Sequence, residues 1–438
     1  MTIKIFRQVK LSLLYWMAVA IAGQLITVPA FAQQVKSVKR PNIIFILADD
    51  LGYETLQCNG GTSYQTPQLN LMAKEGMRFQ QCYATPLCSP SRVELMSGKY
   101  NFRNYIRFGV MDPHEKTFAN LFHDNSYTTC MAGKWQLGEV PEMPKDIGFD
   151  KYCLWHYEAS EKNKGSRYKN PKIYQDGKTT EFTSLEYGPA KFTDYVLDFI
   201  QDNRNKPFFV YYSMVLVHDP FQPVPGDNEY ANAPLNINDT TYFKSMMRYM
   251  DKDVGRVITK VKELGLSDNT IIVFTGDNGT GRAIYSRMGN TIIKGDKGHT
   301  TTAGTHVPLI VQWPEKIKAG SVNNNLVDFS DFYPTFAEMA NLSVPQDHLL
   351  DGTSFYKQLI NKPAAVRDWI FCDYNGSDMG FYHRRYAQDK TWKLYETGEF
   401  YNILSDPDEK SPLADANLSK DEVTVKNKFK LIIARMHK

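Results

Sequence analysis

Residues 41–50 read PNIIFILADD, a short apolar run that ends in two adjacent carboxylates. No charged residue interrupts the run from Ile43 to Ala48, and four of its six members are isoleucine or phenylalanine. Such a segment is typical of a strand that is buried on both faces of a parallel sheet. Open α/β sheets bind ligands beyond the carboxyl ends of such strands, where Asp49 and Asp50 lie. The segment therefore predicts an α/β fold with a ligand site at this strand end, and carboxylate oxygens suit a hard cation.

Further segments predict an alternation of strands and helices. Strands are expected over 77–84, 128–132, 208–217, 270–275 and 307–313. Helices are expected over 66–76, 190–202, 240–264 and 331–341. Residues 150–189 show little periodicity and are interpreted as a surface insertion, either one that shapes a substrate site or a loop without a role. From residue 367 onward, short aromatic runs between turn residues predict a small antiparallel sheet.

A second stretch, residues 88–92, reads CSPSR and is followed by Ser97-Gly98-Lys99. Pro90 suits the first turn of a helix, so Cys88 is expected just before a helix begins. A helix N-terminus carries partial positive charge and free N–H groups, which stabilise a thiolate or a bound oxyanion. Arg92 adds a permanent charge with several donors. The plain alternative is a free cysteine that is buried at a helix start.

Three other expected strands end beside residues of types that can bind anions or cations. Lys134 follows the strand at 128–132, His218 follows the strand at 208–217, and Asp277 and Asn278 follow the strand at 270–275. A structural histidine and an ordinary Asp-Asn-Gly turn are the plain alternatives. If these strands share one sheet with residues 42–48, their ends gather the polar residues into one pocket.

Together these motifs resemble the type I sulfatases of the alkaline-phosphatase-like superfamily, over essentially the whole chain after residue 32. The resemblance implies an α/β fold: a large, mixed, mostly parallel sheet sandwiched by helices, and a smaller C-terminal antiparallel α+β subdomain. The corresponding divisions are a catalytic domain over 33–365 and the subdomain over 366–438. The resemblance also implies that Cys88 is oxidised to formylglycine (3-oxoalanine), an aldehyde whose hydrate attacks the sulfur of a sulfate ester.

The resemblance assigns further contacts residue by residue. A divalent cation, Ca2+ with Mg2+ as the alternative, is expected at an oxygen of modified Cys88 and at four side chains: Asp49, Asp50, Asp277 and Asn278. Arg92 is expected to steady the hydrated aldehyde, and Lys134 and Lys297 are expected to bind the sulfate oxygens. His218 is expected to protonate the leaving alcohol as general acid.

Two segments depart from the family pattern. Gln136 stands where the family has a histidine, and a glutamine cannot carry a proton near neutral pH. The segment around Lys297 has His306 in place of an arginine. His299, two residues after Lys297, is a candidate for the base that Gln136 cannot provide. A surface or structural histidine is the equal alternative for His299.

The first 32 residues predict a secretory signal peptide. Lys4, Arg7 and Lys10 precede an apolar segment, and residues 30–32 provide small residues for cleavage. An uncleaved membrane anchor is the alternative. Cleavage removes three of the 51 basic residues, which leaves 48 against 48 acidic residues. The expected protein is periplasmic or secreted and free of the membrane, and its neutral charge lacks the basic field that attracts nucleic acid.

The expected activity is hydrolysis of sulfate esters, and export together with many tyrosines and tryptophans suits a sulfated carbohydrate as substrate. The resemblance implies one necessary partner, a formylglycine-generating enzyme or an anaerobic sulfatase-maturating enzyme. Two alternatives stay open. One is a phosphodiester or phosphonate monoester hydrolase of the same superfamily, and the other is a non-catalytic protein that binds sulfated glycans.

Overall fold

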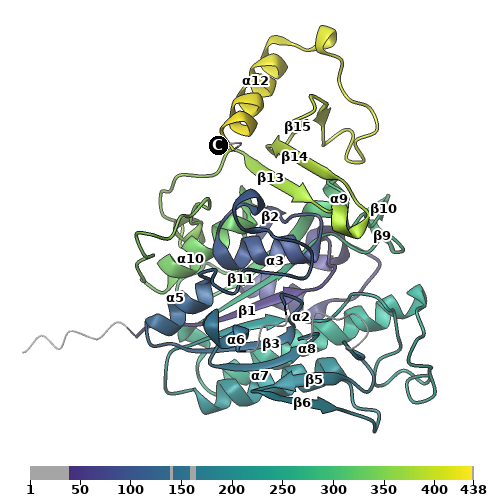
Figure 1. Ribbon diagram of the computed structural model, residues 1–438, viewed down its shortest axis with the longest axis vertical. Helices are drawn as coiled ribbons and strands as arrows, with labels where there is room; N and C mark the ends of the chain where they lie inside the picture. Colours follow the sequence, from purple (N-terminus) through teal and green to yellow (C-terminus); the bar gives the residue numbers. More distant parts are fainter. Residues whose placement is uncertain (1–38, 139–141, 158–163, 437–438) are drawn as a thin grey trace, which may run out of the picture. The chain divides into compact units, whose positions relative to one another are not determined.

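A ten-stranded sheet forms the centre of the fold (Figure 1). The computed structural model describes residues 39–138, 142–157 and 164–436. In spatial order, the strands are β12 (Ser321–Asp328), β2 (Met77–Tyr83), β11 (His306–Gln312), β8 (Thr270–Gly276), β1 (Asn42–Ala48), β7 (Phe208–Ser213), β3 (Thr128–Lys134), β4 (Lys151–Trp155), β5 (Lys172–Gln175) and β6 (Lys178–Glu181).

The sheet is mixed and mostly parallel. At its centre, β1 runs parallel to β7 and β8, and β3 runs parallel to β7 and β4. β11 runs antiparallel to β2 and β8, and β5 and β6 add an antiparallel edge. The predicted α/β fold with a large, mostly parallel sheet is confirmed.

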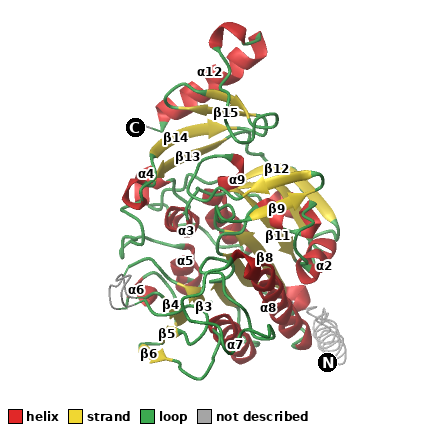
Figure 2. Ribbon diagram, turned by 90° about the vertical axis from the view of Figure 1, so that its right-hand side faces the viewer, coloured by secondary structure: helices red, strands yellow, loops and turns green. Residues whose placement is uncertain are grey.

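Helices cover both faces of this sheet (Figures 1 and 2). One face packs against α3 (Cys88–Ser97), α5 (Phe118–Asp124) and α10 (Phe332–Met339), and the other against α2 (Pro67–Glu75), α7 (Gly188–Asp202) and α8 (Phe243–Glu263). Side chains of β1 alternate between the two cores: Phe45 packs into the first and Ile46 into the second, and both are fully buried. This two-sided burial is why residues 43–48 are apolar throughout.

Parts of the fold differ from the sequence prediction. The interpretation of residues 150–189 as a surface insertion was wrong for β4, which is buried in the sheet from Tyr152 to Trp155. β7 ends at Ser213, although the apolar run continues to Val217. The predicted signal peptide lies outside the described residues. Within the part of the chain that the structure describes, no helix has the length and apolar character needed to cross a membrane.

A four-stranded antiparallel sheet forms the predicted C-terminal subdomain. It consists of β13 (Ile370–Asn375), β14 (His383–Gln388), β15 (Trp392–Tyr395) and β16 (Phe400–Asn402), and α12 (Lys420–Arg435) packs against it. The loop after Lys297 is fixed to this sheet through Thr300, whose hydroxyl lies 2.7 Å from the Tyr395 hydroxyl and whose backbone N–H donates to the Tyr382 hydroxyl at 2.9 Å. The C-terminal sheet therefore helps to position the segment that carries Lys297.

Helix α8 carries a buried carboxyl group whose titration lies near neutral pH. Asp253 is fully buried, and burial raises its pKa to about 7 against the lowering effects of Thr193 and Arg256. The folded chain therefore binds this proton more tightly than the unfolded chain, so its contribution to stability falls as the pH rises toward 7. We expect Asp253→Asn to remove this dependence.

Thermal denaturation of wild type and Asp253→Asn at pH 5 and pH 8 measures this effect. Between these pH values, wild type should lose about 2 kcal/mol of unfolding free energy relative to the variant. Asp268→Asn, in the short helical turn before β8, is the control because the Asp268 side chain is exposed, outside the core. Parallel pH profiles for wild type and Asp253→Asn would contradict the prediction.

Candidate active site

Cys88 begins helix α3 and is almost inaccessible in the folded chain. Leu87 precedes the helix in an extended conformation, so the helix starts one residue earlier than the sequence predicted. Only 1% of Cys88 is exposed, and its Sγ lies 3.8 Å from Gln136 Oε1. The first turn of α3 has backbone N–H groups without intrahelical acceptors, which gives a positive potential at this end of the helix.

The register of the two central strands sets the acidic residues side by side. Ala48 of β1 pairs with Gly276 of β8, and the next residues are Asp49 and Asp277. The Asp277 backbone N–H donates to the Ala48 carbonyl at 3.0 Å. Both carboxylates therefore leave the sheet at the same level, as the strand-end prediction requires.

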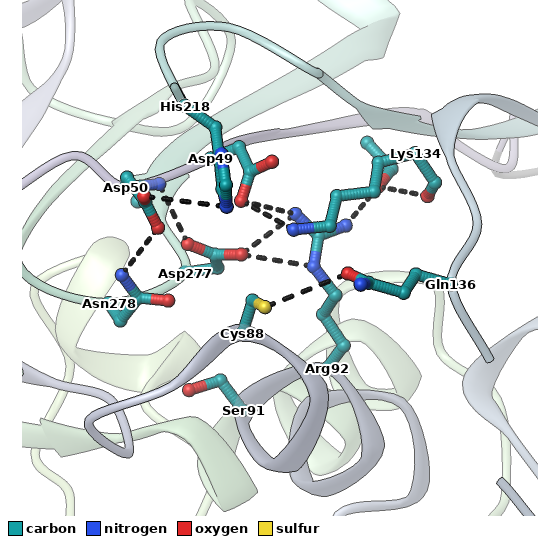
Figure 3. Close-up of polar contacts among 12 residues, drawn as sticks. Asp49, Asp50, Cys88, Ser91, Arg92, Lys134, Gln136, His218, Asp277 and Asn278 are labelled. Atoms are coloured by element: carbon teal, nitrogen blue, oxygen red, sulfur yellow. Dashed lines mark hydrogen bonds and ion pairs between the residues drawn. The ribbon is translucent and has the colours of Figure 1, made fainter. Parts of the chain in front are cut away.

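Four oxygen-bearing side chains meet beside Cys88 (Figure 3). The Asp50 backbone N–H donates to Asp277 Oδ1 at 3.0 Å, and Asn278 Nδ2 donates to Asp50 Oδ1 at 2.9 Å. Ligand atoms of Asp49, Cys88 and Asp277 lie within 4.8 Å of one another. Asp49 Oδ2 and Asn278 Oδ1 are buried without a hydrogen-bond partner among the described residues. These two oxygens remain available for a ligand.

Three basic residues surround the carboxylates, and each pairs with a different one. The pairs are Arg92 Nη2 with Asp277 Oδ2, Lys134 Nζ with Asp49 Oδ1, and Lys297 Nζ with Asp50 Oδ2, each at 2.8 Å. The structure thus brings together the predicted basic residues with the predicted metal ligands.

The environment of this cluster shifts the pKa values of Asp49 and Asp277 in opposite directions. Burial tends to raise the pKa of Asp49, but Lys134, His218 and Arg92 outweigh it and hold this pKa well below its usual range. Burial raises the pKa of Asp277 to about 6, against the lowering effect of Arg92. Asp49 is therefore ionised at neutral pH, and a cation bound here would favour the ionised form of Asp277 as well.

His218 is oriented by partners on both ring nitrogens. Nδ1 lies 2.7 Å from Asp219 Oδ1, and Lys297 Nζ lies 2.8 Å from Nε2. The ammonium of Lys297 can only donate, so Nε2 accepts and Nδ1 carries the proton toward Asp219. Burial lowers the pKa of His218, although Asp50 acts in the opposite direction. The hydroxyl of Tyr168 donates to the His218 backbone carbonyl and fixes the loop.

His299 lies in a different environment. Its Nδ1 is 3.1 Å from Asp296 Oδ1, and its ring packs against Phe381 and Tyr382 of the C-terminal subdomain. His299 does not line the pocket above the site. Gln136 does line it, with a left-handed backbone (φ 49°). The base role of His299 stays a prediction.

The structure adds functional candidates that the sequence did not indicate. Arg167 lies in the predicted insertion, yet it is 8% exposed and its Nη1 is 3.5 Å from Asp49 Oδ2. Ser213 donates to the Lys134 carbonyl at 2.7 Å and accepts from Arg92. Asp219 contacts His218, and the sequence could have indicated this role because Asp219 directly follows the predicted histidine. No such pattern indicated Arg167, since burial of its segment depends on tertiary packing.

A pocket of about 410 Å³ opens above the cluster. Its lining combines polar side chains with an apolar wall that comes partly from the C-terminal subdomain. The lining residues include Asp50, Gln136, Arg167, His218, Lys297, Phe108, Phe221, Met379 and Phe381. Apolar and aromatic side chains beside convergent polar groups suit an amphipathic small molecule such as a sugar.

Comparisons with known proteins agree with the family resemblance that the sequence motifs indicated. The family model "Sulfatase" matches residues 41–342, and the model "N-sulphoglucosamine sulphohydrolase, C-terminal" matches residues 295–436. N-acetylgalactosamine-6-sulfatase of Mus musculus is 30% identical over 359 residues, which cover 74% of this chain and 68% of the relative. N-acetylglucosamine-6-O-sulfatase of Bacteroides thetaiotaomicron is 26% identical over 431 residues, which cover 77% of this chain and 74% of the relative.

A solved structure extends the match to three dimensions. The crystal structure of Ps i-CgsB in complex with k-i-k-neocarrahexaose has a TM-score of 0.74 and 27% sequence identity, and it covers 89% of this chain and 92% of that chain.

Proposed function

The chain belongs to the type I sulfatase family of the alkaline-phosphatase-like superfamily, and we propose that it removes sulfate from carbohydrates with formylglycine at residue 88 and a bound divalent cation. It is a sulfuric ester hydrolase, like the relatives it matches. The observation that carries the finer proposal is the meeting of Cys88 with three carboxylates and three basic side chains in one buried cluster.

The donor set fits a hard divalent cation. Asp49, Asp50 and Asp277 present carboxylates, and the buried, unpartnered oxygens Asp49 Oδ2 and Asn278 Oδ1 offer further ligands among the described residues. Oxygen donors of this kind suit Ca2+, with Mg2+ as the alternative. Bound there, the cation would polarise a sulfate oxygen and offset its charge.

Residue 88 would supply the nucleophile. Formylglycine at this position would present an oxygen nucleophile where a thiol stands before maturation. Because Cys88 is 1% exposed, a maturating enzyme can reach it only before the chain folds. Maturation by such a partner before folding also fits export, which we propose from the first 32 residues, to the periplasm or the exterior.

The remaining residues bind the sulfate and move a proton. In the overall reaction, water is consumed, the S–O bond to the sugar breaks, and the alcohol oxygen gains a proton. Lys134 and Lys297 would donate to the sulfate oxygens as negative charge builds up on them. When Lys297 Nζ turns from His218 Nε2 to the sulfate, Nε2 can take up a proton, and His218, oriented by Asp219, would deliver this proton to the alcohol oxygen. Arg92, bound to Asp277, would steady the oxygen nucleophile at residue 88.

The general-acid role of His218 predicts a dependence on the leaving group. We expect His218→Gln to lower kcat by roughly 10²–10⁴-fold for an alkyl sulfate, whose alcohol needs a proton to depart. The loss should be much smaller for 4-nitrophenyl sulfate, because nitrophenolate departs without one. Steady-state kinetics with both substrates measures this difference. Equal losses for the two substrates would remove His218 from the acid role.

His299→Gln provides the matched histidine variant. If His299 is the base that acts after the alcohol has left, its loss should lower turnover equally for both substrates. Full turnover of His299→Gln would refute the base hypothesis for His299 and leave it a structural residue.

The substrate class is tested by release assays on the matured protein. Matched aryl sulfate and aryl phosphate esters separate a sulfatase from a phosphodiester or phosphonate hydrolase. A panel of sulfated mono- and oligosaccharides, including N-acetylgalactosamine 6-sulfate and N-acetylglucosamine 6-sulfate, then tests the carbohydrate. Sulfate release from a member of the panel supports the proposal. Faster phosphate release, or binding without any turnover, would favour one of the two alternative functions.

A further inference from the structure

Among the basic residues of the site, Arg167 has the longest distance to its nearest carboxylate partner. Arg92, Lys134 and Lys297 each have a carboxylate partner at 2.8 Å. Arg167 Nη1 is 3.5 Å from Asp49 Oδ2, and neither atom has a hydrogen-bond partner among the described residues. A buried guanidinium nitrogen without an acceptor is costly, so such groups commonly have a ligand to bind.

Arg167 is also held in place. Its guanidinium carbon lies 3.9 Å from the centre of the Trp155 ring, at the end of β4. The next residue, Tyr168, donates from its hydroxyl to the Val215 carbonyl at 2.8 Å. Lys169 is buried and donates to three backbone carbonyls at 2.8–3.1 Å. A fixed cation loses little entropy on binding a ligand, which makes the arrangement suited to recognition.

Arg167 faces the same pocket as His218 and Lys297. Its planar fork of donors matches the oxygens of a sulfate or carboxylate better than a lysine does. We propose that Arg167 binds an oxyanion of the substrate, as a third cationic contact beside Lys134 and Lys297. This inference rests on the proposed function. The oxyanion is either the sulfate that is hydrolysed or a second anionic group on the same sugar.

Binding to a non-maturing protein tests the proposal without catalysis. The full chain with Cys88→Ala, loaded with Ca2+, is compared with the same protein carrying Arg167→Met, by calorimetry with two probes. The probes are 4-nitrophenyl sulfate, with one anionic group, and glucosamine 2-N,6-O-disulfate, with two. Arg167→Met should weaken binding by roughly tenfold or more. A loss with both probes identifies the hydrolysed sulfate, and a loss with the disulfate alone identifies the second group.

Two further variants serve as controls. Arg167→Lys keeps the charge without the fork and should give an intermediate loss. Arg204→Met removes a positive charge from the exposed surface outside the pocket and should change both affinities by less than about twofold. Thermal denaturation establishes that the variants are folded.

The proposal is overturned if Arg167→Met binds both probes as tightly as its parent. It is also overturned if Arg167→Met changes only the affinity for Ca2+, because Arg167 would then merely offset the charge of Asp49. Failure of the proposed function has a different result: the matured wild-type chain would release no sulfate, whatever the binding of the Cys88→Ala protein.

Discussion

Cys88→Ala should lower the turnover of sulfate esters by roughly 10⁴-fold or more, since alanine cannot be converted to the aldehyde and no oxygen nucleophile can form. The change itself is small. The Cys88 side chain is buried, and its Sγ lies 3.8 Å from Gln136 Oε1, which is a long contact. We therefore expect a folded protein that binds sulfated ligands but does not hydrolyse them. The measurement is sulfate release from an aryl sulfate.

Cys130→Ala is the matched control. Cys130 is also a free, fully buried cysteine, but it lies within β3. This variant removes the same atom from the core, and its turnover should stay close to that of wild type.

Mass spectrometry of the peptide around residue 88 must find the aldehyde in active wild type. Activity in Cys88→Ala, or an unmodified thiol in active wild type, would refute the nucleophile.

Removal of the cation should also cause a large loss of turnover. A chelator should abolish turnover, and Ca2+ should restore it. Asn278→Ala should lower kcat by roughly 10²–10³-fold at limiting Ca2+, because it deletes the unpartnered oxygen Asn278 Oδ1 from the donor set. Excess Ca2+ should recover part of this loss. Turnover as a function of Ca2+ concentration, for wild type and variant, measures both effects.

Asn323→Ala separates this effect from a general loss of stability. Asn323 lies on the edge strand β12, where its side chain donates to Gln358 at 3.1 Å. We expect its Ca2+ dependence to match wild type. If chelation leaves turnover intact, or if Asn278→Ala shows the wild-type Ca2+ dependence, the carboxylate cluster is not a metal site.

The sequence predicted those features that depend on local pattern. Residues 43–48 are apolar because both faces of β1 are buried, so the strand and the carboxylates that follow it could be predicted from the sequence alone. The same holds for β8 and Asp277. For β7, the apolar run extended the predicted strand beyond Ser213, because Met214 to Val217 are buried without belonging to the ladder. Hydrophobicity reports burial, not hydrogen bonding.

Tertiary contacts determine the features that the sequence missed. Strand β4 and Arg167 lie in a segment without periodicity, and Arg167 is buried because it stacks on Trp155 and faces Asp49. The orientation of His299 toward Asp296 likewise depends on the aromatic side chains of the C-terminal subdomain. Such contacts join residues far apart in the chain, and no local pattern encodes them.

The attachment of Thr300 to the C-terminal sheet has a consequence for durability. Tyr382 and Tyr395 contact the loop that follows Lys297, although neither belongs to the acidic cluster. Proteolytic removal of the C-terminal sheet would therefore inactivate the enzyme, although none of its reacting groups would be lost. The working lifetime of the protein therefore depends on how well strands β13 to β16 resist proteases.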